Sequence, residues 1–317
     1  MAGQEKIPLI VVAGPTASGK TAAAVALAKK LNGEVVSADS MQIYKGMDIA
    51  TAKPTVAEME GVPHHLLDFL EPDQAFTVAD YVSMAGKVIQ DIYSRGKLPI
   101  LAGGTGLYIH SLVDHIQFTE TKNDLLLRSQ LQEEAAAYGN VHMLERLRAL
   151  DPAYAEKLHP NNLNRIIRGL EVCILTGQTM TQQIEESRRE ESPYLPCMLG
   201  LNCLDRQNLY RRINQRVDRM MEMGLLEEAQ HFLARTDLKT AVQAIGYKEL
   251  IPYFRGTLSL EEAVDRIKQE TRRYAKRQLT WFRRDERIHW VYIDVSEENF
   301  QNIVENMQKI IAKGLEI

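Results

Sequence analysis

Length, composition and charge limit what this chain can be. Its 317 residues are 45% hydrophobic and 25% charged, a globular composition that argues against extensive disorder. No apolar run reaches the roughly 20 residues that a membrane span requires, and the run at residues 7–13 is too short for the core of a signal peptide. Three cysteines are too few for a disulfide framework or a zinc site. We therefore expect a cytoplasmic protein of about two domains, or of one large domain with an insertion.

The first hundred residues alternate strand-like and helix-like segments. Four apolar runs predict buried strands, at residues 7–13, 34–38, 66–70 and 98–102. Two further segments predict helices, at residues 21–31, ended by Asn32, and at residues 77–94, with Thr77 as the N-cap. Strands that alternate with helices form a mostly parallel sheet with helices on both faces. The predicted fold class is therefore α/β.

The pattern changes in the middle of the chain, where almost only helical patterns occur. In this middle part, helices are expected at residues 124–138, 141–150 and 162–175. After it, strands are expected at residues 197–203 and 290–295, and helices at residues 207–223, 260–282 and 296–313. We therefore predict a core domain in two parts, residues 1–118 and 197–317, the second with basic C-terminal helices. An all-helical insertion domain, residues 119–196, separates the two parts.

A phosphate-binding loop follows the first predicted strand. Residues 14–21, GPTASGKT, fit the pattern G-x-x-x-x-G-K-[ST] between a strand and a helix. Glycines let backbone N–H groups surround a phosphate, Lys20 supplies positive charge, and the hydroxyl of Thr21 can bind Mg²⁺. The motif predicts a P-loop core that binds a phosphorylated ligand, but it does not name the reaction.

Two further polar residues follow buried strands and should face the same crevice. Nucleotide hydrolases usually carry an acidic residue after a second buried strand, but the strand at residues 98–102 ends in GGTG. Asp39 follows the strand at residues 34–38, and Thr105 follows the strand at residues 98–102. Ligands of parallel sheets bind beyond the carboxyl ends of the strands. Asp39 could therefore act as a general base and Thr105 could orient a phosphate or a leaving oxygen, although either could also be an ordinary turn residue.

Positive charge is concentrated in two segments. The net charge of −4 by itself argues against a nucleic-acid partner. Residues 272–287, however, hold seven basic and two acidic residues, and residues 205–219 hold five arginines and two aspartates. RNA binding depends on the local density of Lys and Arg, so the first segment fits either an RNA-binding surface or a solvated basic helix. Arg212 and Arg216, four residues apart on one helical face, suit a diphosphate.

Several longer motifs follow the phosphate loop in the chain. The phosphate loop is followed by SADSMQIYKGMDIATAKP at residues 37–54 and by GGTGLY at residues 103–108. NRIIR at residues 164–168, AIGYK at residues 244–248 and TRRYAKRQLTWFR at residues 271–283 come next. In sequence and in order, these motifs resemble those of bacterial tRNA dimethylallyltransferases, the IPP transferase family. The resemblance covers nearly the whole chain, and the DSxQxY and KRQxTWF pieces are far more specific than the phosphate loop.

The resemblance implies a reaction and its substrates. It implies transfer of a dimethylallyl group from dimethylallyl diphosphate to N6 of the adenosine that follows the anticodon, position 37 of tRNA, with release of diphosphate. Asp39 would handle the N6 proton, Thr105 would help bind the diphosphate, and Mg²⁺ would be the cofactor with Thr21 as its ligand. The partners would be the anticodon stem-loop of tRNA and dimethylallyl diphosphate, and we expect a monomer that does not associate with a membrane.

The resemblance also assigns binding residues. Those expected to bind the donor are Gly14, Thr16, Ala17, Ser18, Gly19, Lys20, Thr21, Arg128, Arg212 and Arg216. Those expected to contact tRNA are Ser40, Met41, Gln42, Arg165, Arg168, Gly246, Tyr247, Lys248, Arg273, Lys276, Arg277 and Trp281.

Three other functions are compatible with parts of the sequence. An adenylate isopentenyltransferase would perform the same chemistry on a free nucleotide, but it would not need the helical insertion or the basic C-terminal helix. A P-loop kinase would phosphorylate a metabolite with ATP. An RNA-binding protein with a vestigial phosphate loop would not need Lys20, Thr21, Asp39 and Thr105 to be intact.

Overall fold

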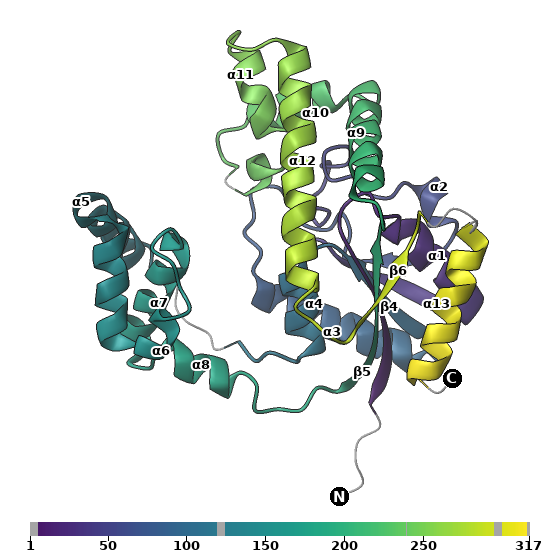
Figure 1. Ribbon diagram of the computed structural model, residues 1–317, viewed down its shortest axis with the longest axis horizontal. Coiled ribbons are helices and arrows are strands. Elements are labelled where there is room, and N and C mark those ends of the chain that lie inside the picture. Colours follow the sequence, from purple (N-terminus) through teal and green to yellow (C-terminus); the bar gives the residue numbers. More distant parts are fainter. Residues whose placement is uncertain (1–5, 119–123, 239, 295–299, 316–317) are drawn as a thin grey trace, which may run out of the picture. The chain divides into compact units, whose positions relative to one another are not determined.

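The computed structural model describes residues 6–118, 124–238, 240–294 and 300–315. Its centre is a six-stranded sheet in which all neighbouring strands are parallel (Figure 1). In spatial order the strands are β3 (His64–His65), β2 (Gly33–Ala38), β4 (Leu98–Gly103), β1 (Ile7–Ala13), β5 (Tyr194–Asn202) and β6 (Ile288–Tyr292). The predicted α/β class with a mostly parallel sheet is confirmed.

The register of three central strands brings their carboxyl ends to one level. Ala13 of β1 and Ala38 of β2 both pair with Gly103 of β4. Only glycine fits at this position, because a Cβ on Gly103 would lie 2.2 Å from the carbonyl oxygen of Ala38. The loops that follow β1, β2 and β4 therefore start side by side, at the edge where parallel sheets bind ligands.

Alternate residues of β1 contribute to two hydrophobic cores, one on each side of the sheet. Leu9 and Val11 belong to the core that includes the helices α3 (Val78–Ser94) and α4 (Gly106–Val113). Ile10 and Val12 belong to the core that includes α1 (Lys20–Leu31) and α13 (Phe300–Leu315). This alternation is the period of two expected of a strand with both faces buried. Thr77 caps α3 and Asn32 ends α1, both as predicted.

A third core lies among the helices that follow β5. These helices are α9 (Arg206–Glu222), α10 (Leu225–Leu233), α11 (Ile251–Phe254) and α12 (Leu260–Phe282), with 3-10 turns at Ala241–Gln243 and Lys248–Leu250. Their apolar residues enclose Ile43, Tyr44 and Met47, which follow β2. The segment after Asp39 is therefore anchored in a core of its own. The short helix α2 (Val56–Met59) comes later in the same segment.

Residues Asp114–Glu191 form a separate compact unit. Its helices are α5 (Leu125–Leu150), α6 (Pro152–Ala155), α7 (Leu163–Thr176) and α8 (Met180–Glu186), packed around a core that includes Leu131, Leu147 and Ile167. Gly139, with a φ of 86°, interrupts α5 where two helices were expected. The predicted end of the helical segment at residue 196 needs correction, because β5 already starts at Tyr194.

Other local predictions were wrong or incomplete. No strand forms at residues 66–70: Leu66 and Asp68 have positive φ values, and only Leu70 forms a bridge, with Tyr44. The sequence does not predict α2, α4, α6, α8, α10 or α11, most of which are short, and α4 begins at Gly106, the last glycine of the GGTG segment. The predicted strand at residues 290–295 ends, and the predicted helix at residues 296–313 begins, among residues 295–299. These five residues lie outside the described part. No helix in that part is long and apolar enough to cross a membrane.

Candidate active site

The loop after β1 has the backbone that a phosphate site requires. Gly14 has a φ of +146°, and a Cβ there would lie 2.4 Å from the carbonyl oxygen of Leu201. Gly19 also has a positive φ, of 83°, and α1 begins directly after it at Lys20. The Nζ of Lys20 donates a hydrogen bond of 2.8 Å to the carbonyl of Pro15, which folds the lysine side chain back over the loop. A helix start enclosed by such a loop favours an anion.

The loops after β2 and β4 hold Asp39 and Thr105 in place. Oδ1 of Asp39 accepts hydrogen bonds from the backbone N–H groups of Met41 at 2.9 Å and Gln42 at 3.3 Å. Oγ1 of Thr105 accepts one from the backbone N–H of Ser40 at 3.1 Å, and the N–H of Thr105 donates to Ala38. Thr105 therefore joins two of the three loops, and Asp39 is oriented by the turn that follows it.

Charges from three elements interact at this edge. Burial and the positive charge of Arg216 lower the pKa of Lys20 to about 7, although Asp39 acts in the opposite direction. Burial also lowers the pKa of Arg216, again opposed by Asp39. The site therefore holds two cationic side chains and one carboxylate close enough to influence each other. Such a site gains stability when an anionic ligand adds negative charge.

The two arginines of α9 have different positions. Nε of Arg212 donates a hydrogen bond of 2.8 Å to the carbonyl of Ala17, so Arg212 supports the phosphate loop from outside. Arg212 is exposed, whereas Arg216 is partly buried and interacts electrostatically with Lys20 and Asp39. Arg216 is therefore the arginine whose charge acts on Lys20 and Asp39.

Two residues of α12 also belong to this site: Gln278, for which the sequence predicts no role, and Tyr274, which the sequence predicts as a ring that could stack on an unpaired base rather than as part of this crevice. Oε1 of Gln278 accepts a hydrogen bond of 2.8 Å from the N–H of Thr16, and its Nε2 donates one of 2.9 Å to the carbonyl of Gly104. Burial and the charge of Asp39 raise the pKa of Tyr274, whose hydroxyl lies near the side chains of Thr105 and Gln278. The KRQxTWF motif contains Gln278, but its contacts depend on loops more than 170 residues away in sequence.

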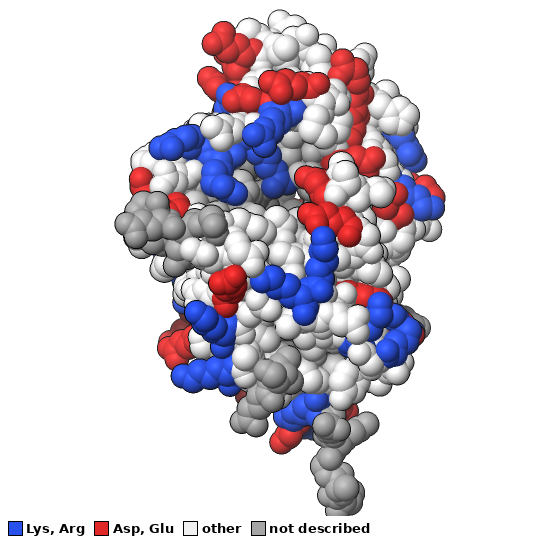
Figure 2. All heavy atoms as spheres, turned by 90° about the vertical axis from the view of Figure 1, so that its right-hand side faces the viewer, with Lys and Arg blue, Asp and Glu red and all other residues white. Residues whose placement is uncertain are grey.

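The basic side chains of α12 have the exposure that RNA binding requires. Arg273, Lys276 and Arg277 are exposed, and the guanidinium of Arg277 lies 5.7 Å from the centre of the Tyr274 ring. Trp281 is partly buried against the core, with its ring over Gly106, where a Cβ would lie 2.3 Å from it. On the face shown in Figure 2, basic and acidic side chains are intermixed.

The segment at residues 246–248 requires a correction. Gly246 and Tyr247 are buried, Tyr247 completely, and the hydroxyl of Tyr247 donates a hydrogen bond of 2.8 Å to Glu228. The predicted contact between Tyr247 and RNA is therefore wrong, because the ring of Tyr247 is part of the third core. Lys248 is exposed and stays a candidate RNA contact.

The other predicted RNA contacts after β2 are partly buried and support a loop. Ser40, Met41 and Gln42 form the turn that orients Asp39. Nε2 of Gln42 donates hydrogen bonds to the carbonyls of Thr51 and Ala52, at 3.2 and 3.1 Å. These contacts show how the turn is held, and RNA binding by the three residues stays a prediction.

Three predicted site residues lie in the helical unit. Arg128 of α5 and Arg168 of α7 both form ion pairs with the buried carboxylate of Glu171, at 3.6 and 3.5 Å, while Arg165 is exposed. Their predicted contacts with substrates stay predictions.

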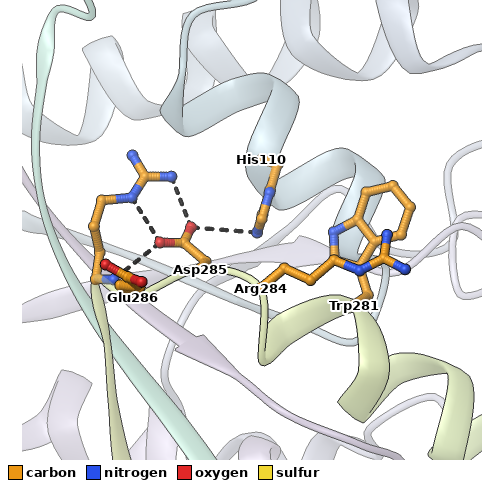
Figure 3. A pocket seen from close by; sticks show the side chains of 6 residues that line it. His110, Trp281, Arg284, Asp285 and Glu286 are labelled. Atoms are coloured by element: carbon orange, nitrogen blue, oxygen red, sulfur yellow. Dashed lines mark hydrogen bonds and ion pairs between the residues drawn. The ribbon is translucent and has the colours of Figure 1, made fainter. Parts of the chain in front are cut away.

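A cavity of about 500 Å³ lies at the end of α12 and is lined by His110, Trp281, Arg284, Asp285, Glu286 and Arg287. Asp285 points toward His110 of α4, with Nε2 and Oδ2 3.4 Å apart (Figure 3). Burial would raise the pKa of Asp285, but hydrogen bonds with Arg287 outweigh it and lower the pKa. Of the groups that line the cavity, His110 and Arg287 therefore both pair with the carboxylate of Asp285.

No group of three or more His, Cys, Asp or Glu side chains that could hold a metal ion occurs among the residues described. Mg²⁺ does not require such a group, since it usually binds one or two protein oxygens together with substrate phosphates. Thr21, in the first turn of α1 beside Lys20, offers a hydroxyl of that kind.

Comparison with known proteins gives a consistent result over the whole chain. The sequence profile of the family described as IPP transferase matches residues 42–285. A tRNA dimethylallyltransferase of Thermoanaerobacter sp. (strain X514) is 48% identical over 98% of this chain and 99% of its own length. The one from Bacillus subtilis (strain 168) is 50% identical over 90% of each chain.

Solved structures show the same likeness. The full-length tRNA isopentenylpyrophosphate transferase from Bacillus halodurans superposes with a TM-score of 0.73 at 44% identity, covering 98% of this chain and 97% of the other. A eukaryotic dimethylallyltransferase acting on tRNA gives a TM-score of 0.81 at 30% identity, covering 97% and 80%. The chain described here therefore belongs to the IPP transferase family.

Proposed function

We propose that this protein transfers the dimethylallyl group of dimethylallyl diphosphate to N6 of the adenosine at position 37 of tRNA and releases diphosphate. The observation that carries the proposal is the meeting of Lys20, Arg216, Asp39 and Thr105 at the carboxyl ends of adjacent strands in a member of this family. A positive site for a diphosphate and a carboxylate beside it are the two features that the reaction needs.

The chemistry follows from these positions. The exocyclic amine of adenine is a weak nucleophile, so the allylic carbon must carry a leaving group whose developing charge is stabilised. Lys20, Arg216 and the N–H groups of the phosphate loop would bind the diphosphate and stabilise that charge. A C–N bond forms at N6, the C–O bond to diphosphate breaks, and Asp39 accepts the proton lost from N6. Thr105 would orient the leaving oxygen.

Mg²⁺ fits the residues at the donor site. We propose that the hydroxyl of Thr21 and the oxygens of the bound diphosphate hold the ion, as expected for a cation that prefers oxygen ligands. When bound, Mg²⁺ supplies further charge stabilisation for the diphosphate. The exposed basic side chains of α12 would hold the RNA, and the reactive base would have to leave its stack to reach the crevice.

The localisation and assembly of the protein are also part of the proposal. We expect it to act in the cytoplasm, where its RNA substrate is found, and as a monomer. Light scattering of the purified protein tests the second expectation, since a mass near 36.0 kDa is expected for one chain.

The experiment that tests the function uses radiolabelled dimethylallyl diphosphate and tRNA from a strain that lacks the modification. Label recovered in adenosine after RNA hydrolysis supports the proposal, and tRNA that already carries the modification is the control. Transfer to AMP with none to tRNA would identify a free-nucleotide transferase. Consumption of ATP without prenyl transfer would identify a kinase.

A further inference from the structure

Gln278 joins two loops that both belong to the proposed donor site. It is 6% exposed, and both ends of its amide are used: the oxygen accepts from Thr16 in the phosphate loop, and the nitrogen donates to Gly104 after β4. A Cβ on Gly104 would lie 2.2 Å from this nitrogen, so the close approach depends on glycine. Gln278 therefore acts as a clamp between the ends of β1 and β4.

The clamp continues to the third loop. Thr105, next to Gly104, accepts the N–H of Ser40 in the turn that orients Asp39. The hydroxyl of Tyr274, one helical turn before Gln278 on α12, lies near the side chains of Thr105 and Gln278. The three loops are thus cross-linked by Gln278 of α12 and Thr105 of the β4 loop. If α12 moves, the phosphate loop therefore has to move with it or lose the hydrogen bond between Thr16 and Gln278.

The same helix carries the proposed RNA contacts. Arg277 is adjacent to Gln278 in sequence, and its guanidinium lies 5.7 Å from the ring centre of Tyr274. Arg273 and Lys276 are exposed on the same part of α12. RNA phosphates held by these side chains would fix the position of the helix segment that clamps the phosphate loop. When bound RNA restricts α12, less conformational entropy is left to lose when diphosphate orders the phosphate loop, so the free-energy cost of binding diphosphate falls.

We propose that Gln278 is a positioning residue that couples the binding of RNA to the binding of the diphosphate donor. This inference rests on the proposed function, which supplies the RNA and the diphosphate donor as ligands. Because coupling between two ligands is reciprocal, RNA tightens diphosphate binding by the same factor by which diphosphate tightens RNA binding. The physical route runs from α12 through the Gln278 amide to Thr16 and Gly104.

The test measures that factor without catalysis. The ligands are inorganic diphosphate and an anticodon stem-loop in which the reactive adenosine is replaced by a purine that lacks the 6-amino group. In the wild-type protein, saturating RNA lowers the Kd for diphosphate by about fivefold or more. In Gln278→Met, which keeps the chain length but removes both hydrogen bonds, the factor falls to near one. RNA affinity in the absence of diphosphate stays within about twofold.

The matched control is Gln269→Met. Gln269 lies on the same helix and is exposed, and its side chain forms no hydrogen bond within the described residues, so this variant keeps the wild-type factor. In turnover at saturating RNA, Gln278→Met raises the KM for dimethylallyl diphosphate about five- to tenfold, and Gln269→Met does not. A Gln278→Met protein with the wild-type coupling factor overturns the proposal, as does a factor of one in the wild-type protein.

A second variant removes the clamp while keeping the glutamine. In Gly104→Ala the new methyl group displaces the Gln278 amide, so the coupling factor falls as in Gln278→Met. Full coupling in this variant counts against the proposal. Failure of the wild-type protein to prenylate tRNA would instead contradict the proposed function, since the binding measurement does not use the reaction.

Discussion

At the residue scale, the site combines groups whose neighbours determine their chemistry. Asp39 receives two backbone N–H groups on one oxygen and lies within electrostatic reach of Lys20 and Arg216. Lys20 is held against Pro15 by a hydrogen bond and beside a second cation. The carboxylate is suited to accept a proton, whereas the cations are suited to bind a diphosphate.

Removal of the Asp39 carboxylate should affect turnover far more than RNA binding. We expect Asp39→Ala to lower kcat by about 10²–10⁴-fold, because general bases contribute that much, and to leave the Kd for tRNA within about threefold. Single-turnover kinetics and filter binding measure the two quantities. Asp265→Asn, at an exposed position of α12, is the control. An equal loss of turnover and RNA affinity in Asp39→Ala would contradict the assigned role.

The pKa of Lys20 predicts a pH dependence of donor binding. With a pKa of about 7, Lys20 is mostly neutral in the free protein above pH 7, and bound diphosphate restores its charge. Binding therefore takes up a proton above pH 7, so the Kd for inorganic diphosphate rises with pH by up to about tenfold per unit. Lys20→Arg stays protonated and should lack this component. Identical pH profiles for the two proteins would refute the prediction, since the ionisation of diphosphate is common to both.

At the element scale, α12 has two roles. Its buried face contributes Ala275 and Phe282 to the hydrophobic cores and Gln278 to the loop clamp, while Arg273, Lys276 and Arg277 are exposed. A capping box of Ser259 and Glu262 starts the helix. One helix can therefore bind RNA on its surface and position the donor loops from its buried side.

The surface role predicts a salt-dependent loss of affinity. Arg277→Ala should weaken tRNA binding several-fold and reduce the slope of log K against log salt by about one, as expected when one phosphate contact is lost. Titrations at several salt concentrations measure the slope. Lys309→Ala, an exposed charge on α13, should leave it unchanged. An unchanged slope in Arg277→Ala would place Arg277 outside the RNA contact.

At the scale of the whole molecule, contacts between distant segments decide which residues reach the surface. The carboxylate of Glu228 on α10 accepts the N–H groups of Asp48, Ile49 and Ala50 and the hydroxyl of Tyr247. Burial and this carboxylate raise the pKa of Tyr247 well above its usual value. A single side chain thus joins the segment after β2, α10 and the AIGYK motif.

Loss of this junction should reduce stability. We expect Glu228→Ala to lower the free energy of unfolding by about 2 kcal/mol or more, because several donors lose a charged acceptor at once. Denaturant unfolding of the purified protein measures the change. Glu227→Ala, at the adjacent exposed position, should stay within about 0.5 kcal/mol. Equal stability of the two variants would show that water replaces the carboxylate without cost.

Local patterns in the sequence were sufficient for much of the fold. The apolar run of β1, the caps of α3 and the glycines of the phosphate loop express preferences of the chain over a few residues, and all three are found as predicted. Residues after the strands could be assigned to one crevice because parallel strands share a direction. The short β3 was misplaced, since its pairing depends on a turn with positive φ at Leu66 and Asp68.

The sequence by itself determined the α/β class, the phosphate loop and the motifs that carry the family resemblance, because each depends on local spacing. Only the tertiary structure decided that Gln278 joins Thr16 to Gly104, that Arg212 donates to the phosphate loop while the charge of Arg216 acts on Lys20, and that Tyr247 is buried. These outcomes depend on contacts between segments far apart in the chain. No local pattern encodes them, since the partner of a side chain is chosen by packing of the whole fold.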